Sequence, residues 1–168
     1  MTISMYSASV PVFKQILGSL SDLLDKAETH AVAKKIDPNA LLQARLFPDM
    51  FPLTRQIMIA ADFAKGACAR LAGMEVPKYE DTEQSFAELR ARIAKTVAFI
   101  DSLPRDQIDG SEERDITTSA GPNSKSFKGQ TYLLQYALPQ FFFHATTAYA
   151  ILRHNGIEIG KKNFMGQY

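Results

Sequence analysis

Apolar residues recur at alternating intervals of three and four in four separate segments of the chain, and this spacing limits the fold more than any other feature. Such a repeat lines up side chains along one stripe of an α-helix, where they pack against neighbouring helices. The pattern predicts an all-α protein, an up-and-down four-helix bundle. The first three stripes are Val10, Phe13, Leu17, Leu20, Leu24 and Ala27; Leu53, Ile57, Ala60, Ala64, Ala67 and Leu71; and Phe86, Leu89, Ile93, Thr96, Ile100 and Leu103.

Local signals give approximate ends for the second and third helices. The second is expected from about Phe51 to Ala72, with Gly73 in the usual position after a helix end. For the third, Ser85 and Glu88 have the spacing of a capping box, in which side chains satisfy the first free N–H groups. Glu88 and Arg92 stand four apart, which is typical of a pair on a solvated flank.

The fourth helix is expected from about Gln130 to Asn155, with a bend at Pro139. The segment from Gly129 to Leu152 has no Asp, Glu, Lys or Arg and is long enough to span a bilayer. Its Gln, His and Thr residues are costly in lipid, so we interpret it as a buried central helix. Its core stripe is Leu134, Ala137, Phe141, His144, Ala148 and Ile151.

This helix carries a second apolar stripe, formed by Leu138, Phe142, Tyr149 and Leu152. One stripe about 100° wide is enough to fill the core of a bundle, so the second requires another cover. We expect a homodimer through this face. The alternative cover is the polar segment Asp109–Lys128, a long excursion or short hairpin between helices three and four. Its turn is predicted at Gly121–Ser124, and any strand should lie between Glu112 and Gly129.

Length, charge and cysteine content narrow the class of protein. The 168 residues fit a single domain, 1–168, and the net charge of +1 gives no reason to expect a nucleic-acid or membrane partner. The N-terminus has no basic stretch before its apolar residues, as a signal peptide would. A single cysteine, Cys68, excludes a disulfide within the chain and suits a cytoplasmic location. The expected role of Cys68 is a small buried apolar residue.

Four motifs along the chain suggest a known family. They are Phe47-Pro48-Asp49-Met50-Phe51-Pro52-Leu53; Ala69-Arg70-Leu71-Ala72-Gly73 with Pro77; Phe142-Phe143-His144-Ala145-Thr146-Thr147-Ala148-Tyr149; and Ile151-Leu152-Arg153-His154-Asn155-Gly156 with Gly160-Lys161. These motifs resemble domain-of-unknown-function family 1993, in the DinB-like superfamily. The resemblance spans nearly the whole chain and implies a DinB-like four-helix bundle, frequently paired into homodimers. It implies no particular reaction.

Some relatives in that superfamily bind a divalent metal through three histidines, one on the second helix and two on the fourth at i and i+4. Some of those relatives are thiol-dependent transferases. The second helix of this chain has no histidine, and the residue four after His144 is Ala148. We therefore expect no metal and no cofactor.

His144 is the most informative candidate, because its position on the core stripe predicts a buried imidazole hydrogen-bonded to a neighbour such as Gln140. Asp62 is expected to form a solvated pair with Lys65. Two hypotheses remain open. The first is a dimeric ligand-binding or interaction protein with a vestigial pocket, and the second is a metal-assisted or thiol-dependent transferase or hydrolase using His144. Catalytic residues are not identified; candidate ligand-binding residues are His144, Gln140, Gln56, Asp62 and Tyr149.

Overall fold

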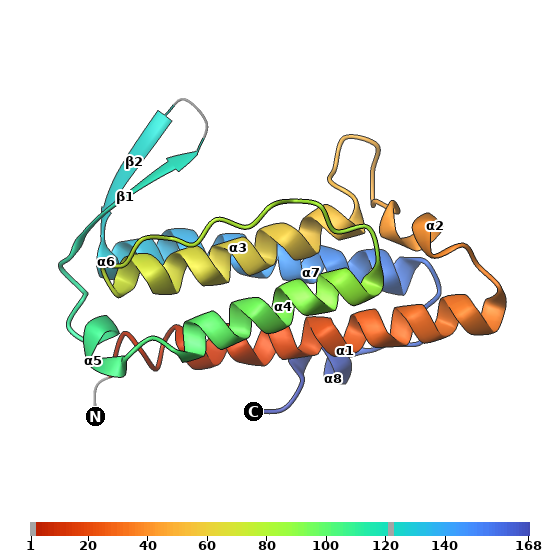
Figure 1. Cartoon of the computed structure of the whole chain (residues 1–168), viewed down its shortest axis with the longest axis horizontal. Coiled ribbons are helices and arrows are strands. Elements are labelled where there is room, and N and C mark those ends of the chain that lie inside the picture. Colours follow the sequence, from red (N-terminus) through yellow and green to blue (C-terminus); the bar gives the residue numbers. More distant parts are fainter. Residues whose placement is uncertain (1–2, 121–122) are drawn as a thin grey trace.

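The structure is a computed structural model that describes residues 3–120 and 123–168. It is mainly helical, with one small two-stranded sheet beside the helices (Figure 1). The elements in chain order are α1 (Val10–Lys34), α2 (Pro38–Leu42), α3 (Leu53–Leu71), α4 (Phe86–Asp101), α5 (Arg105–Ile108), β1 (Asp115–Ala120), β2 (Asn123–Lys128), α6 (Gly129–Thr131), the π-helix η1 (Tyr132–Ala137), α7 (Leu138–His154) and α8 (Lys161–Met165).

The four long helices lie side by side, with α3 packed against α7 and α4, and α1 packed against α4 and α7. Nearly every residue of the predicted core stripes is fully buried, as the periodicity requires. Phe13 of α1 and Phe141 of α7 meet edge to face in the centre, with 4.8 Å between ring centroids. Burial of these side chains is the main favourable term in forming the fold.

Helices α3 and α4 run in the same direction, so the expected up-and-down order is wrong. Asp62 of α3 pairs with Arg92 of α4. One turn further along both helices, Lys65 and Lys95 lie over the same ring, that of Tyr79. In Figure 1 the chain leaves the end of α3, returns along the helix and enters α4 from the end at which α3 began.

Residues 72–85, called the crossover strap below, are long enough to connect the two parallel helices α3 and α4. At about 3.3 Å per extended residue they can span roughly 45 Å, whereas α3 is only about 28 Å long. A short loop would force neighbouring helices to be antiparallel. The length of this stretch is a sequence signal that the predicted up-and-down order did not take into account.

The predicted core stripe of the last long helix is not buried at its first residue, since Leu134 is 47% exposed. It lies in η1, where the wider turn shifts each side chain around the helix axis relative to an α-helix. Pro139 follows at the start of α7 and lacks the N–H that a regular helix would use there. Among the described residues, no helix combines the length and apolarity needed to cross a membrane.

The predicted short hairpin is present, as β1 and β2 pair antiparallel with Ile116 opposite Phe127. Ile116 is buried, and the ring of Phe127 lies 5.2 Å from that of Tyr136 in η1. These contacts fix the strands against the start of the last long helix. The predicted turn residues Gly121 and Pro122 lie outside the described residues.

The segment after α7, residues 155–168 and called the C-terminal arm below, covers part of the second stripe of α7. The ring of Tyr149 meets Phe164 of α8 at 5.7 Å, and α8 in turn packs on α1. Leu152 is buried, and Leu138 and Phe142 are half-buried against the core. The chain therefore covers most of this stripe itself, and the cover over Tyr149 comes from the arm.

Candidate functional site

His144 is buried, as its place on the core stripe predicts, with 8% of its surface exposed. Its Nδ1 atom lies 2.7 Å from Oε1 of Gln56, on the facing helix α3. The expected partner Gln140 is wrong: it lies one turn back on the same helix and lines a shallow surface hollow instead. Gln56, another candidate ligand-binding residue, is almost completely buried.

The hydrogen bonds of Gln56 fix the tautomer of His144. The amide Nε2 of Gln56 donates to the carbonyl of Phe51 at 3.1 Å, so Oε1 faces the imidazole. An amide oxygen can only accept, and Nδ1 must therefore carry the proton. Burial lowers the pKa of His144, which favours the neutral ring with a free lone pair on Nε2.

Two aromatic rings enclose the imidazole. Phe63 lies nearly parallel to it, 6.0 Å between centroids with 15° between the planes. Phe143 meets it edge-on at 5.2 Å. Among the described residues Nε2 has no hydrogen-bond partner, yet it is not one of the fully buried unpartnered atoms, so it retains contact with solvent.

The surroundings of His144 do not fit the metal centre of the histidine-rich relatives. Its closest polar partner is an uncharged amide, and a zinc site needs three or four N, O or S ligands around one point. No cluster of three or more His, Cys, Asp or Glu residues that could hold a metal occurs within residues 3–120 and 123–168. Cys68 offers no thiolate either, because burial raises the pKa of its thiol far above the usual range.

Asp62 belongs to a different group of residues, on the α4 side of α3. It pairs with Lys65 at 2.8 Å as predicted, but Lys65 is buried and Arg92 joins the pair with two contacts of 3.0 Å. The side chain of Arg92 is only 1% exposed, so the expected solvated pair of Arg92 with Glu88 is wrong. Glu88 instead accepts a hydrogen bond from the backbone N–H of Gln84 at 2.6 Å, and so caps the start of α4.

Arg92 ties the crossover strap to the helices. Beyond Asp62 it binds Asp81 and Glu83 of the strap, at 3.0 and 2.9 Å, and it also donates to the carbonyl of Glu80. Asp81 pairs in turn with Arg55 of α3. Desolvation opposes ionisation of Asp81, but the hydrogen bonds and charges of Arg55 and Arg92 outweigh it and lower its pKa.

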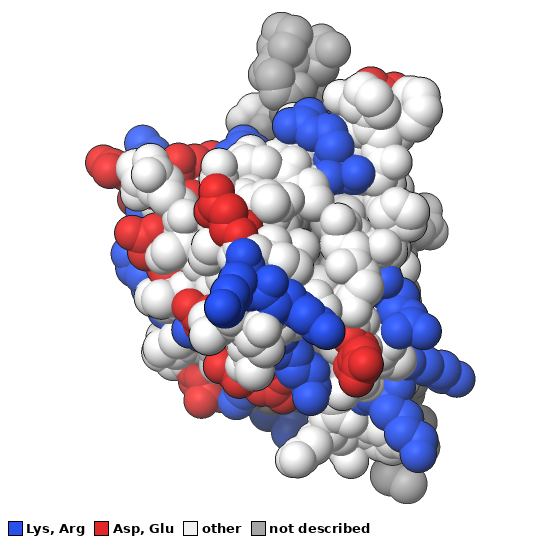
Figure 2. Space-filling model, turned by 90° about the vertical axis from the view of Figure 1, so that its right-hand side faces the viewer, with Lys and Arg blue, Asp and Glu red and all other residues white. Residues whose placement is uncertain are grey.

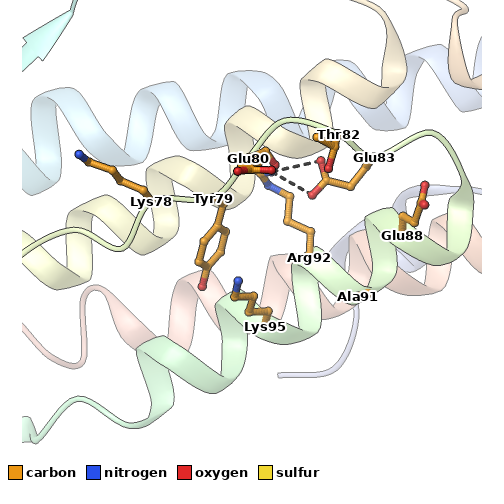
Figure 3. Close-up of a pocket in the computed structure, with 9 residues that line it drawn as sticks. All are labelled: Lys78, Tyr79, Glu80, Thr82, Glu83, Glu88, Ala91, Arg92 and Lys95. Atoms are coloured by element: carbon orange, nitrogen blue, oxygen red, sulfur yellow. Dashed lines mark hydrogen bonds and ion pairs between the residues drawn. The ribbon is translucent and has the colours of Figure 1, made fainter.

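Figure 3 shows the hollow beside this cluster, about 460 Å³ in volume, between the strap and α4. Arg92 reaches up from α4 toward Glu83, while Tyr79 points down from the strap toward Lys95. The Nζ atom of Lys95 lies 4.2 Å from the Tyr79 ring centre, within cation–π range. Most polar groups around this hollow bind one another, and these contacts hold the strap against α4.

Sequence reasoning missed the Arg92 cluster, although a signal was present. The strap carries Glu80-Asp81-Thr82-Glu83, an acidic run next to a helix in which Arg92 lies one position before the core residue Ile93. A cation beside a core position needs a nearby anion, because an unpaired buried charge is very costly. That requirement could have linked the acidic run to Arg92.

The candidate residues therefore divide into separate places. The structure brings His144 and Gln56 together, with Gln140 in a neighbouring hollow along the outer side of α7. Asp62 lies with Arg92, and Tyr149 packs against the C-terminal arm. Of five well-formed hollows among the described residues, none is lined by more than one of these five side chains.

An apolar surface surrounds Phe143, which is 55% exposed. A groove of about 470 Å³ runs beside it, lined almost wholly by apolar atoms. The outward residues of α7 here carry no charge. Phe47 and Phe51, in the loop between α2 and α3, are also exposed. The groove is lined by Leu46, Phe142, Phe143, Thr146, Thr147 and Ala150.

Comparison with known proteins agrees with this fold. The family model "Domain of unknown function (DUF1993)" matches residues 5–165. A crystal structure of a DinB family member from Shewanella denitrificans is 40% identical, with a TM-score of 0.88, covering 97% of this chain and 92% of that one. No curated protein matches the chain significantly. The chain therefore belongs to the DUF1993 family and has the helical fold of a DinB family member.

Proposed function

We propose that this protein is a non-catalytic, homodimeric binding or interaction protein, in which the DinB-like pocket is vestigial. The observation that carries the proposal is the hydrogen bond from His144 Nδ1 to Gln56 Oε1. It gives the most buried histidine a neutral structural partner, and in the described part of the chain no group of three His, Cys, Asp or Glu residues that could hold a metal surrounds it. Gln140 and Phe143, on the neighbouring surface of α7, would take part in binding rather than chemistry.

The dimer would form through the outer face of α7. In a two-fold interface the same patch occurs on both subunits, so charges near the axis would face their own copies. Residues Gly129–Leu152 have no charged side chain, and Phe143 stands exposed among them. Exposed aromatic residues are typical of interface cores. The part of the second stripe that the C-terminal arm covers, around Tyr149, would lie outside the contact.

The remaining features fit a role away from nucleic acids and membranes. The net charge is +1, and Figure 2 shows acidic and basic residues both present on the face that carries α2. The four long helices would form one four-helix bundle domain over residues 1–168. A reducing cytoplasm suits the single, deeply buried Cys68.

A second candidate is an enzyme that uses His144 as a general base, in a metal-assisted or thiol-dependent transferase or hydrolase reaction. The specific observation in its favour is the neutral imidazole, whose Nε2 lone pair keeps contact with solvent. A neutral histidine with one nitrogen fixed by a partner can accept a proton at the other. This reading needs a substrate to enter beside Phe143.

Sedimentation velocity at micromolar concentration tests the dimer. We expect a dimer for the wild type and a monomer for Phe143→Asp, because the substitution would place two carboxylates near the two-fold axis. Val32→Asp, at an even more exposed apolar residue of α1, should remain dimeric. A wild-type monomer would refute the dimer.

Metal analysis and zinc or nickel titration test the alternative. Purified protein should contain no stoichiometric divalent metal, and zinc or nickel should bind no more tightly to wild type than to His144→Gln. Tight binding that disappears in His144→Gln would overturn the non-catalytic reading and favour the enzyme. The same variant leaves the α7 surface unchanged, so its dimerisation is the internal control.

A further inference from the structure

A smaller hollow, of about 210 Å³, lies between α3, the hairpin and η1. It is separate from the His144–Gln56 pair but shares a wall with it, because the ring of Phe63 contacts both Tyr136 and His144. Its lining combines aromatic rings, hydroxyl groups and charges from three elements. The residues are Asp62, Phe63, Arg70, Thr118, Ser119 and Tyr136.

Arg70 is held in this hollow by its neighbours. Its side chain folds back along α3 over Gly66, where an added Cβ would come within 2.6 Å of Nη1. Nη1 donates to the hydroxyl of Tyr132 at 3.1 Å, and Tyr132 is almost completely buried. Glycine weakens a helix interior, so its presence here is explained by the room it gives the guanidinium.

Arg70, which lines this hollow, and Lys125, which lies beside its Tyr136 wall, both lack a counter-ion among the residues that the structure describes. In the described part of the chain, neither Arg70 nor Lys125 has a carboxylate within 4.0 Å. The Nζ atom of Lys125 lies 5.6 Å from the ring centre of Tyr136. Asp62, the carboxylate that lines the hollow, binds Arg92 and Lys65 instead. Within the described residues, Arg70 is therefore left without a counter-ion in this hollow.

Thr118 adds a hydrogen-bonding group without a protein partner. It is only 7% exposed and lies opposite Lys125 in the hairpin register. Its hydroxyl makes no hydrogen bond to the described residues, and it is not among the fully buried unpartnered atoms. Since Thr118 lines the hollow, the small exposed part of this side chain opens into it.

The geometry points to a binding site for a small planar organic carboxylate. Its carboxylate would bind the free edge of Arg70, and its planar body would pack on Phe63 and Tyr136. A guanidinium matches a carboxylate through two parallel N–H groups. The hollow is smaller than the roughly 300 Å³ at which drug-sized pockets begin, so it fits a single ring. Asp62 at the other end disfavours a second negative charge.

This inference names the ligand class for the binding role proposed above, and benzoate is the probe that tests it. Titration of the isotope-labelled full chain should give saturable shifts of the Phe63, Thr118 and Tyr136 amides. Benzamide has the same shape without the charge, and it should bind at least tenfold more weakly. Inorganic phosphate should not compete at the same concentration.

Two variants separate the position of Arg70 from its charge. Arg70→Gln should weaken benzoate binding at least tenfold, as expected when a charge-assisted pair is lost. Gly66→Ala keeps the charge and favours the helix, but displaces the guanidinium, and it should weaken binding by a similar factor. Arg153→Gln removes an exposed arginine of α7 and should leave the affinity unchanged.

Equal binding of benzoate and benzamide, unchanged affinity in Arg70→Gln, or shifts that do not saturate would each overturn the carboxylate site. The outcome is independent of the oligomeric state. A dimer that does not bind benzoate would refute this site alone, whereas a monomer that binds it would refute the proposed dimer alone.

Discussion

The two sides of α3 are joined to their neighbours by different chemistry. On the α7 side the polar contact is one neutral hydrogen bond, between His144 and Gln56. On the α4 side it is an ionic network in which Arg92 binds three carboxylates. Helices α3 and α7 are antiparallel and need no additional support, because their apolar stripes face each other. The parallel pair α3–α4 depends on a long strap, and the ions attach that strap to both helices.

This difference teaches that buried polarity has two roles in the same fold. The neutral pair satisfies the groups it contains and keeps one histidine uncharged. The ionic network joins segments that apolar packing leaves free, since the strap contributes few buried side chains. The two interfaces should therefore respond differently to substitution, pH and salt.

The largest effect is expected when the ionic network loses its centre. Arg92→Met should reduce the free energy of unfolding by about 3 kcal/mol, because three carboxylates lose their common partner. This value is at the low end of the range expected for breaking a buried ion pair, because Asp62 and Asp81 are partly solvated. Urea denaturation followed by circular dichroism measures it, and trypsin should cleave faster at Lys78 in the strap.

Lys14→Met is the matched control, since it removes a cation from an exposed pair with Asp101. Its effect should be within about 0.5 kcal/mol. A similar small loss in Arg92→Met would show that the network is not needed to hold the strap.

A smaller effect is expected on the neutral side. Gln56→Met should cost about 1–2 kcal/mol, because Nδ1–H of His144 and the carbonyl of Phe51 lose their partner. A double-mutant cycle with His144→Phe should give a coupling energy near 1 kcal/mol. Gln107→Met, at an exposed glutamine of α5, should change stability little. A coupling energy of zero would mean that the hydrogen bond does not stabilise the interface.

The pH dependence should separate the two sides. The pKa of His144 is lowered in the folded state, so the unfolded chain binds the proton first, and stability falls as pH drops below about 6.5. The pKa of Asp81 is also lowered, so its contribution is present above about 3.9 and is lost at lower pH.

His144 is expected to contribute a loss of stability as the pH falls through about 6.5, because burial holds its pKa below that of the unfolded chain. Chemical denaturation between pH 7.5 and 5.5 measures it. His144→Gln should remove this part of the slope and leave the loss below pH 4. An unchanged slope in that variant would assign the effect to other groups.

Salt should have the smallest effect and should act on one side only. Raising the ionic strength from 0.1 to 1 M shortens the Debye length from about 10 to 3 Å. The coupling energy between Arg92 and Asp62 should fall by about 0.5 kcal/mol, while that between Gln56 and His144 stays constant. Double-mutant cycles at both salt concentrations measure this, and equal changes would contradict the distinction between ionic and neutral interfaces.

The sequence predicted the core far better than the polar contacts. The stripes of α1, α3 and α4 are buried throughout, and the hairpin lies within the predicted limits. The burial of His144 followed from its place on the stripe of α7. Its partner did not, because spacing within one helix identifies neighbours on that helix, whereas Gln56 is 88 residues away.

Leu134 shows a second limit of periodicity. The stripe of α7 assumed a regular α-helix from Gln130 onward, but a π-helix precedes Pro139 and turns Leu134 to solvent. The proline was visible in the sequence and indicated a bend. Its effect on side-chain direction depends on the backbone conformation that forms where the proline cannot donate a hydrogen bond, here a π-helix.

What the sequence by itself determined is which apolar side chains of α1, α3 and α4 are buried, because their burial follows from a local period of apolar residues along each helix. The tertiary structure decided the direction of α4, the partners of Arg92 and His144, and the hollow that holds Arg70. All of these depend on where the strap and the hairpin place residues that are distant in the chain. Apolar packing is non-directional and accepts either helix order. Hydrogen bonds and ion pairs require particular atoms at particular distances, and only the folded arrangement supplies them.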